Sequence, residues 1–151
     1  MRWPRSCRCR PPRFQKRVEC REAAKELNVA ETGCRRHLPA TRVAKTHRFE
    51  IAGHSGFIIV GLYPDGRPGE MFVRMSKAGS TLRGVMDALA TTVSLGLQYG
   101  VPLEVLVAKF AYSRFEPFGS TDNEDLPQAS SIVDYVFRWL SREFAAAVEE
   151  N

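Results

Sequence analysis

Residues 57–75 read FIIVGLYPDGRPGEMFVRM, and this stretch decides the fold class. Phe57 to Tyr63 is rich in β-favouring residues and apolar on both alternating faces, which predicts a central strand. The Gly- and Pro-rich connection PDGRPG follows it. Glu70 to Met75 then predicts the second strand of an antiparallel hairpin. Upstream, Phe49 to Ile51 is expected to add a third strand.

Helical spacing of apolar residues replaces this pattern after residue 80. A first helix is expected to begin at Ser80-Thr81, a pair suited to an N-cap, and to end near Gly100. A second helix is expected to start at Pro102. The predicted apolar stripes of these two helices consist of Leu82, Val85, Met86, Leu89, Val93 and Leu97, and of Leu103, Leu106, Val107 and Phe110.

A third helix is predicted from Gln128 to Ala147, after the long acidic loop SRFEPFGSTDNEDLP. Asp134, Arg138 and Arg142 are expected to face solvent or to form ion pairs. The predicted buried face consists of Ile132, Val133, Val136, Phe137, Leu140 and Phe144. Together these elements predict an α+β fold, in which a small antiparallel sheet packs against about three helices.

Charge divides the 151 residues into two unlike parts. Residues 1–48 carry 14 basic and 4 acidic side chains, whereas residues 49–151 carry 8 basic and 13 acidic ones. We therefore expect a basic, cysteine-containing and largely disordered arm over residues 1–45, followed by one compact domain over residues 46–151. The chain offers no apolar run long enough to cross a membrane and no secretory signal, which favours the cytoplasm.

The four cysteines all lie in the arm, at positions 7, 9, 20 and 34. Because nothing indicates secretion, reduced thiols are expected rather than disulfides. Cys34 and His37 have a spacing that suits zinc, but the other cysteine spacings are irregular and supply no second ligand pair. We predict no metal site. The arm's Arg and Lys residues form no recognised nucleic-acid-binding motif, so binding of nucleic acid by the arm is not expected.

Two places in the domain are candidates for binding or chemistry. Lys77, Gly79, Ser80 and Thr81 stand at a helix start, where free N–H groups favour an anion such as a nucleotide phosphate. Because the full phosphate-loop pattern is absent, an ordinary N-cap is the favoured interpretation. His54, in GHSG, has no sequence-adjacent carboxylate or nucleophile, so a structural turn histidine is favoured over an acid or base.

Long segments of the chain resemble a known family. These are LPATR at residues 38–42, the run from residue 46 through THRFEIAGHSGFIIVGLY to residue 110, and SRFEPFGSTDNEDLPQASSIVDYVFRWLSREF at residues 113–144. They resemble the TSCPD-type C-terminal domain of adenosylcobalamin-dependent (class II) ribonucleotide reductases. The resemblance implies adenosylcobalamin for the parent enzymes, and none is predicted to bind this chain alone.

The resemblance implies a non-catalytic role, because the catalytic barrel of the family has no counterpart here. No catalytic or cofactor-binding residue is therefore predicted. The expected function is that of a C-terminal domain, split subunit or fragment of a vitamin B12-dependent ribonucleoside-diphosphate reductase, with the catalytic barrel chain as partner. His54, Arg114 and Glu116 are expected to make inter-domain contacts. The alternative is a free-standing regulatory module that binds a nucleotide or nucleic acid.

Overall fold

The computed structural model describes residues 35–76 and 81–144. Its centre is an antiparallel sheet of β1 (Ala44–Ile51), β2 (His54–Leu62) and β3 (Pro68–Met75), in the order β1-β2-β3. The predicted hairpin and third strand are therefore confirmed, with β2 in the middle. The first strand starts earlier than the predicted Phe49, because pairing with β2 continues back to Ala44 opposite Gly61.

Side chains alternate between the two faces of β2, as strand geometry requires. Ile58, Val60 and Leu62 are buried on one face, whereas Phe57 on the other face is exposed. The two apolar faces predicted for this strand are therefore not equally covered. Among the residues that the structure describes, the helices cover the face that carries Ile58 and leave the other face open.

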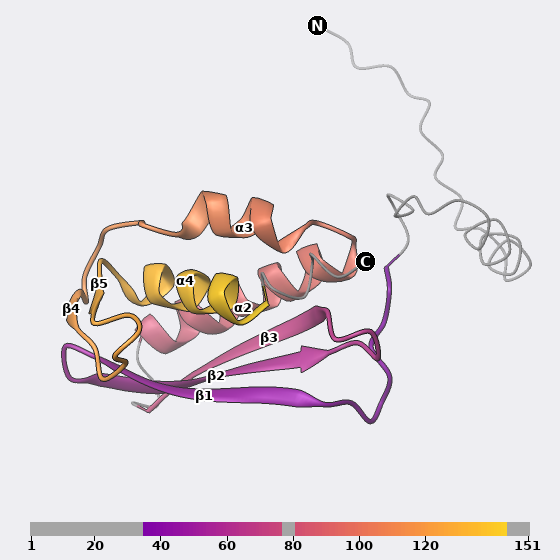
Figure 1. Cartoon of the computed structure of the whole chain (residues 1–151), viewed down its shortest axis with the longest axis horizontal. Helices are drawn as coiled ribbons and strands as arrows, with labels where there is room; N and C mark the ends of the chain where they lie inside the picture. The colour runs from indigo at the N-terminus through magenta and orange to yellow at the C-terminus, as the bar shows by residue number, and fades with distance from the viewer. Residues whose placement is uncertain (1–34, 77–80, 145–151) are drawn as a thin grey trace, which may run out of the picture. The chain divides into compact units, whose positions relative to one another are not determined.

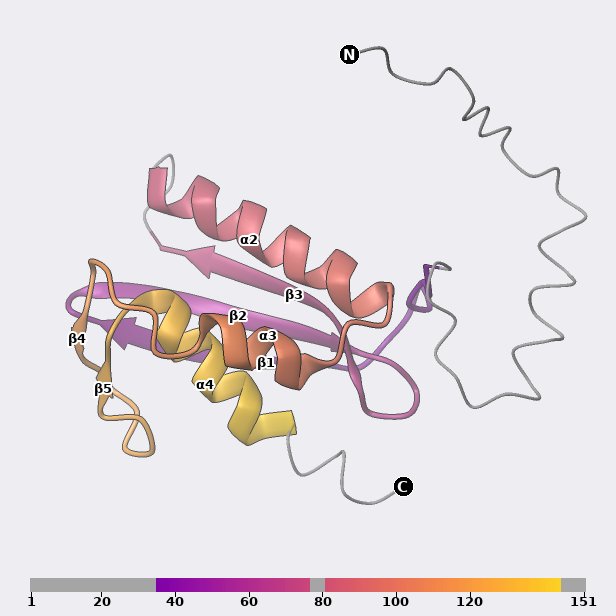
Figure 2. The same ribbon diagram turned by 90° about the horizontal axis from the view of Figure 1, so that it is seen from above.

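The described helices are α2 (Thr81–Gln98), α3 (Leu103–Phe110) and α4 (Ile132–Phe144). They lie on the same side of the sheet (Figure 1). Seen from above, α2 runs alongside β3, while α3 and α4 lie over the other strands (Figure 2). This arrangement confirms the predicted α+β architecture, one sheet with helices on one face.

Helix α2 also shields the outer edge of β3. The Ser94 hydroxyl accepts a hydrogen bond from the Met71 N–H at 2.8 Å, and the Gln98 amide donates to the Gly69 carbonyl at 3.1 Å. Unpaired edge groups invite pairing with other chains, so these contacts protect the sheet. The helix ends at Gln98, and the predicted stop signal Gly100 follows it with a φ of 87°, which permits a left-handed turn there.

Helix α4 begins later than predicted. Residues from Gln128 were expected to be helical, but Gln128–Ala129 forms β5 and pairs with β4 (Gly119–Ser120). The helix starts only after Ser131, because the Ser131 hydroxyl accepts a hydrogen bond from the Asp134 N–H at 2.9 Å and so caps the first turn. Residues 145–147 of the predicted helix lie outside the described residues.

The predicted buried face of α4 is confirmed, because all six of its apolar residues are buried. The stripe predicted for α2 is only partly right. Met86 and Val93 are buried, whereas Val85 is 59% exposed. The buried face of α2 is centred on Met86, Ala90 and Val93, and Val85 lies about 100° around the helix from Met86.

Residues 35–43, which the charge pattern assigns to the arm, contact the domain. The Arg36 N–H donates to the Gln98 carbonyl at 2.8 Å, and the Tyr63 hydroxyl donates to the Arg36 carbonyl at 2.7 Å. Arg42 forms an ion pair with Glu70 on β3. The predicted disorder of residues 1–34 concerns residues outside the described ranges.

A polar cluster lies where β1 meets α4. The His47 ring stacks on Trp139 at a centroid distance of 4.8 Å, and its Nε2 lies 2.8 Å from the Tyr135 hydroxyl. That hydroxyl also accepts a hydrogen bond from the Asn123 amide at 3.0 Å, which leaves its proton for His47. Burial lowers the pKa of His47, and the carboxylates of Asp122 and Glu143 oppose this effect only in part. A neutral imidazole fits this site best.

Because the pKa of His47 is lower in the folded than in the unfolded chain, the unfolded state takes up the proton first. The free energy of unfolding should therefore fall as the pH drops below about 6.5, with a limiting slope of about 1.4 kcal/mol per pH unit. His47→Phe keeps a ring against Trp139 and should flatten this slope in urea denaturation between pH 7 and 5. The matched control is His37→Phe, at an exposed position, which should leave the slope of the free energy of unfolding against pH unchanged. Equal slopes for both variants would contradict the assignment.

Candidate docking site

A tight turn places His54 at one end of the sheet. Strands β1 and β2 are joined by two residues, Ala52 and Gly53, with φ values of 48° and 76°. Two positive φ angles in a two-residue hairpin loop match the twist of the flanking strands. His54 pairs with Ile51 directly after this turn, so its position is set by the hairpin.

The acidic loop reaches the same end of the sheet. The Ala52 N–H donates to the Ser120 carbonyl at 3.4 Å, and Thr121 forms a bridge with Ile51. A Cβ atom on Gly119 would lie 3.3 Å from the Ala52 Cβ, so glycine permits this close approach. The contacts bring residues just before Gly119 beside the hairpin turn.

The hairpin turn, the start of α2 and the acidic loop border an open depression of about 450 Å³. It is lined by His54 after the turn, by Leu82 in the first turn of α2, and by loop residues Glu116, Pro117 and Phe118. Its lining combines two apolar side chains and a proline with one imidazole and one carboxylate. A shallow hollow of this kind suits a projecting side chain or loop of a protein partner better than an enclosed small molecule.

Two of the three residues predicted to make inter-domain contacts therefore line one hollow, His54 and Glu116. The third, Arg114, lies beside it, with its guanidinium carbon 5.5 Å from the centroid of the Phe118 ring. Sequence reasoning missed Leu82 and Phe118 as surface residues of this site. Phe118 is 47% exposed. Its place as an aromatic residue in a polar loop is the sequence feature that could have indicated a contact site.

The predicted anion site is only partly within the described structure. Lys77, Gly79 and Ser80 lie outside the described residues. Thr81 is the first residue of α2, next to Leu82 in the lining of the depression. Binding of an anion at this helix start stays a prediction.

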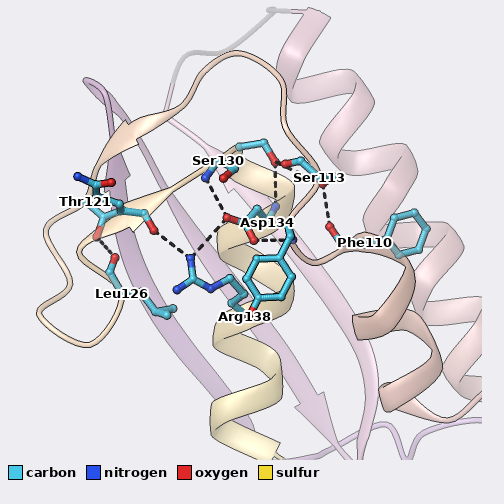
Figure 3. Close-up of polar contacts among 10 residues, drawn as sticks. Phe110, Ser113, Thr121, Leu126, Ser130, Asp134 and Arg138 are labelled. Carbon is cyan, nitrogen blue, oxygen red and sulfur yellow. Dashed lines mark hydrogen bonds and ion pairs between the residues drawn. The ribbon is translucent and has the colours of Figure 1, made fainter.

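A buried carboxylate fixes the loop that carries Glu116 and Phe118. Asp134 is fully buried and accepts hydrogen bonds from the Tyr112 N–H at 2.7 Å and from the Ser130 N–H at 2.9 Å (Figure 3). Its other partner is Arg138, at 3.5 Å. Because Tyr112 and Ser130 lie at the two ends of the loop, one side chain holds both ends on α4.

Neighbouring hydroxyls extend this network. The Ser131 hydroxyl donates to the Ser113 carbonyl at 2.7 Å, and the Ser113 hydroxyl donates to the Phe110 carbonyl at 2.7 Å. Within the loop, the Thr121 hydroxyl donates to the Leu126 carbonyl (Figure 3). Asp134 was expected to face solvent or form an ion pair. It does pair with Arg138, but its burial was missed, because helical spacing does not reveal the loop that covers it.

Neither a metal site nor a membrane-spanning helix is found among the described residues. Across residues 35–76 and 81–144, no three His, Cys, Asp or Glu side chains come together as a metal would require. All four cysteines lie outside these ranges. None of the helices within them combines the length and the apolar character needed to span a bilayer.

The depression does not fit a cobalamin. The depression is open, and its five lining residues would leave most of a corrin in solvent. We therefore derive no chemical step through that cofactor for this chain.

Comparison with known proteins identifies the family. The TSCPD domain model matches residues 25–144, and the chain belongs to this family. It matches the C-terminal region of vitamin B12-dependent ribonucleotide reductases at about 50% identity. No solved structure matches the chain significantly.

The curated relatives are much longer proteins. The vitamin B12-dependent ribonucleotide reductase of Rhodopirellula baltica is 53% identical over 133 residues, which cover 86% of this chain and 13% of the relative. The corresponding protein of Streptomyces avermitilis is 49% identical over 82% of this chain and 13% of its own length, and that of Bradyrhizobium diazoefficiens is 44% identical over 71% and 9%. The chain thus spans about one eighth of the first two relatives.

The buried carboxylate gives a direct test of this architecture. Asp134→Ala would leave two N–H groups and the Arg138 guanidinium without their acceptor, so the free energy of unfolding should fall by about 3 kcal/mol. The matched control is Asp125→Ala, which removes an exposed ion pair with Arg142 and should cost less than about 1 kcal/mol. Urea denaturation measures both. Equal losses would show that Asp134 does not anchor the loop.

Proposed function

We propose that this chain is a non-catalytic domain that docks onto the catalytic portion of a vitamin B12-dependent ribonucleotide reductase. The observation that carries the proposal is the extent of the match, 86% of this chain against only 13% of the Rhodopirellula baltica relative. A domain that forms a small part of a long enzyme has the rest of that enzyme as its first candidate partner.

The docking surface we assign is the depression together with its rim, defined by His54, Leu82, Glu116, Phe118 and Arg114. It offers an exposed aromatic ring with an arginine over it, and such residues supply much of the binding energy in protein interfaces. His54 and Glu116 add polar groups that fix orientation. Asp134 holds the loop in place before a partner arrives, which lowers the entropic cost of binding.

The same docking surface would be used whether this sequence is a domain within a longer chain or a separate subunit. In both cases the deoxyribonucleotide-forming chemistry belongs to the partner, and this chain contributes contacts. We expect the assembly to act in the cytoplasm. Adenosylcobalamin would bind the catalytic portion.

A chimera tests this function. Residues 25–144 of this chain should replace the matching segment of the Rhodopirellula baltica relative with retention of deoxyribonucleotide formation, because the two proteins are 53% identical over 133 residues. In that chimera, Phe118→Asp should lower the rate at least about tenfold, since a charge would enter a desolvated contact. Limited proteolysis should show the domain released from the catalytic portion.

The matched control is Val105→Asp, an equally exposed apolar residue on α3 outside the depression. It should leave both the rate and the proteolysis pattern unchanged. The docking function would be contradicted if the relative kept its full rate after deletion of the matching segment. Equal effects of both substitutions would argue against this surface.

A further inference from the structure

Strand β1 forms one margin of the sheet, and the direction of its backbone groups follows from its pairing with β2. The Val43 carbonyl accepts a hydrogen bond from the Leu62 N–H of β2 at 2.9 Å. The Glu50 N–H points the other way and bonds to the Asp122 carboxylate at 3.0 Å, outside the sheet. Because these directions alternate along a strand of an antiparallel pair, the even-numbered residues of β1 present their N–H and C=O groups away from β2.

Part of this outer edge is open. Among the described residues, none forms a hydrogen bond with the outward backbone groups of Ala44, Thr46 or Arg48. Toward the end of β1 the acidic loop closes the edge, through the carboxylate of Asp122 and the bridge formed by Thr121. The open stretch therefore runs from Ala44 to Arg48.

The other margin of the same sheet is covered. On β3, the Met71 N–H and the Gly69 carbonyl bond to the side chains of Ser94 and Gln98 of α2. Unpaired edge groups attract a further strand, and proteins commonly cover or block them. The described part of this domain blocks one edge and leaves five residues of the other available, which is the arrangement that strand addition requires.

The position of α4 decides what kind of partner fits beside β1. Its side chains lie along the strand, with Trp139 stacked on His47 at 4.8 Å and Glu143 paired with Lys45 at 2.5 Å. The helix crosses above β1, and its C-terminal end lies beyond the strand in the view from above (Figure 2). A second copy that paired its own β1 here would bring its own α4 into the same space. The edge therefore suits an extended segment that carries no helix of its own.

Side chains beside the open stretch define the chemistry of that segment. On the side of the sheet away from the helices, the charged side chain of the stretch is Arg48, which is 65% exposed and lies 3.7 Å from Glu50. On the helix side, Val43 is 72% exposed, and the Lys45 ammonium is already paired with Glu143. Opposite charges directly across two strands stabilise their pairing. A carboxylate therefore complements the first side, and apolar side chains complement the second.

We propose that the edge of β1 from Ala44 to Arg48 binds an extended segment of a partner protein as an additional antiparallel strand, with a carboxylate opposite Arg48 and apolar side chains toward α4. Hydrogen bonds to the main chain supply the affinity, and the alternating side chains supply the specificity. Antiparallel pairing is slightly more stable per residue than parallel pairing. No residue of this edge lines the depression, so the proposal does not depend on the docking function.

Amide hydrogen exchange in the full chain, followed by NMR, gives the first test. In the free chain the N–H groups of Thr46 and Arg48 should exchange fast, whereas those of Lys45 and His47, which face β2, should exchange slowly. The probe is an acetylated and amidated pentapeptide, glutamyl-valyl-threonyl-valyl-threonine. Antiparallel pairing places its glutamate opposite Arg48, and its addition should slow exchange at Thr46 and Arg48. Unchanged exchange at both residues would overturn the proposal.

A proline at the centre of the edge tests the main-chain contact. Thr46→Pro removes one outward N–H group, which an edge strand tolerates, and should abolish the slowed exchange at Arg48. The matched control is Thr46→Val, which keeps the N–H group and should bind the peptide as the unchanged chain does. Equal binding by the two variants would argue against strand addition. Circular dichroism melting identifies a variant that fails to fold.

Charge reversal keeps the proposal testable if the proline variant does not fold. The glutamyl peptide should bind at least about threefold more tightly than the same peptide with lysine in place of glutamate, and Arg48→Glu should reverse this order. A reversed preference is not a consequence of damage to the fold. The matched control is Arg67→Glu in the β2–β3 connection, an exposed arginine that should keep the original order.

Two further results would contradict the proposal. The first is a preference between the two peptides that does not change with the charge at Arg48. The second is a dimer of the free chain in sedimentation equilibrium that Thr46→Pro dissociates and Thr46→Val keeps, since a second copy would then occupy the edge. The isolated chain serves for every one of these measurements, so their outcome is separate from that of the reductase chimera.

Discussion

Burial of one face of β2 is the constraint on which the rest of the domain depends. Exposure of Ile58 and Val60 to water would be costly, and both side chains are fully buried beneath the helices. Helix α4 supplies Ile132, Val136 and Leu140 to the same core, and α2 covers β3. Because α2, α3 and α4 all lie on this one side, the other side of the sheet is uncovered among the described residues.

The two surfaces differ in how they are built. The docking depression is made by a loop and a hairpin turn, and it depends on Asp134, which fixes the loop from beneath. The face of the sheet opposite the helices needs no such support, because the pairing of β2 with β3 fixes the positions of Phe57 and Arg74.

Much of the fold was predictable because it follows from periodicity. A run of β-favouring residues that is apolar on both faces predicted β2, and the Gly- and Pro-rich connection after it predicted the hairpin with β3. The spacing of Val133, Val136 and Leu140 predicted the buried face of α4. The predictions were wrong where contacts between residues distant in sequence override local patterns. Gln128 joined β5 because Ser120 was available to pair with it, and Val85 is exposed because no element covers that side of α2 among the described residues.

The sequence predicted the three-stranded sheet, most of each helix and the family, and it marked His54, Arg114 and Glu116 as candidates. The tertiary structure was needed to show that His54 and Glu116 line one hollow, because they lie 62 positions apart and local patterns carry no information on such distances. It also decided that Asp134 is buried and that Phe57 is exposed. Burial depends on which element packs over a side chain, and this packing is established only in the folded chain.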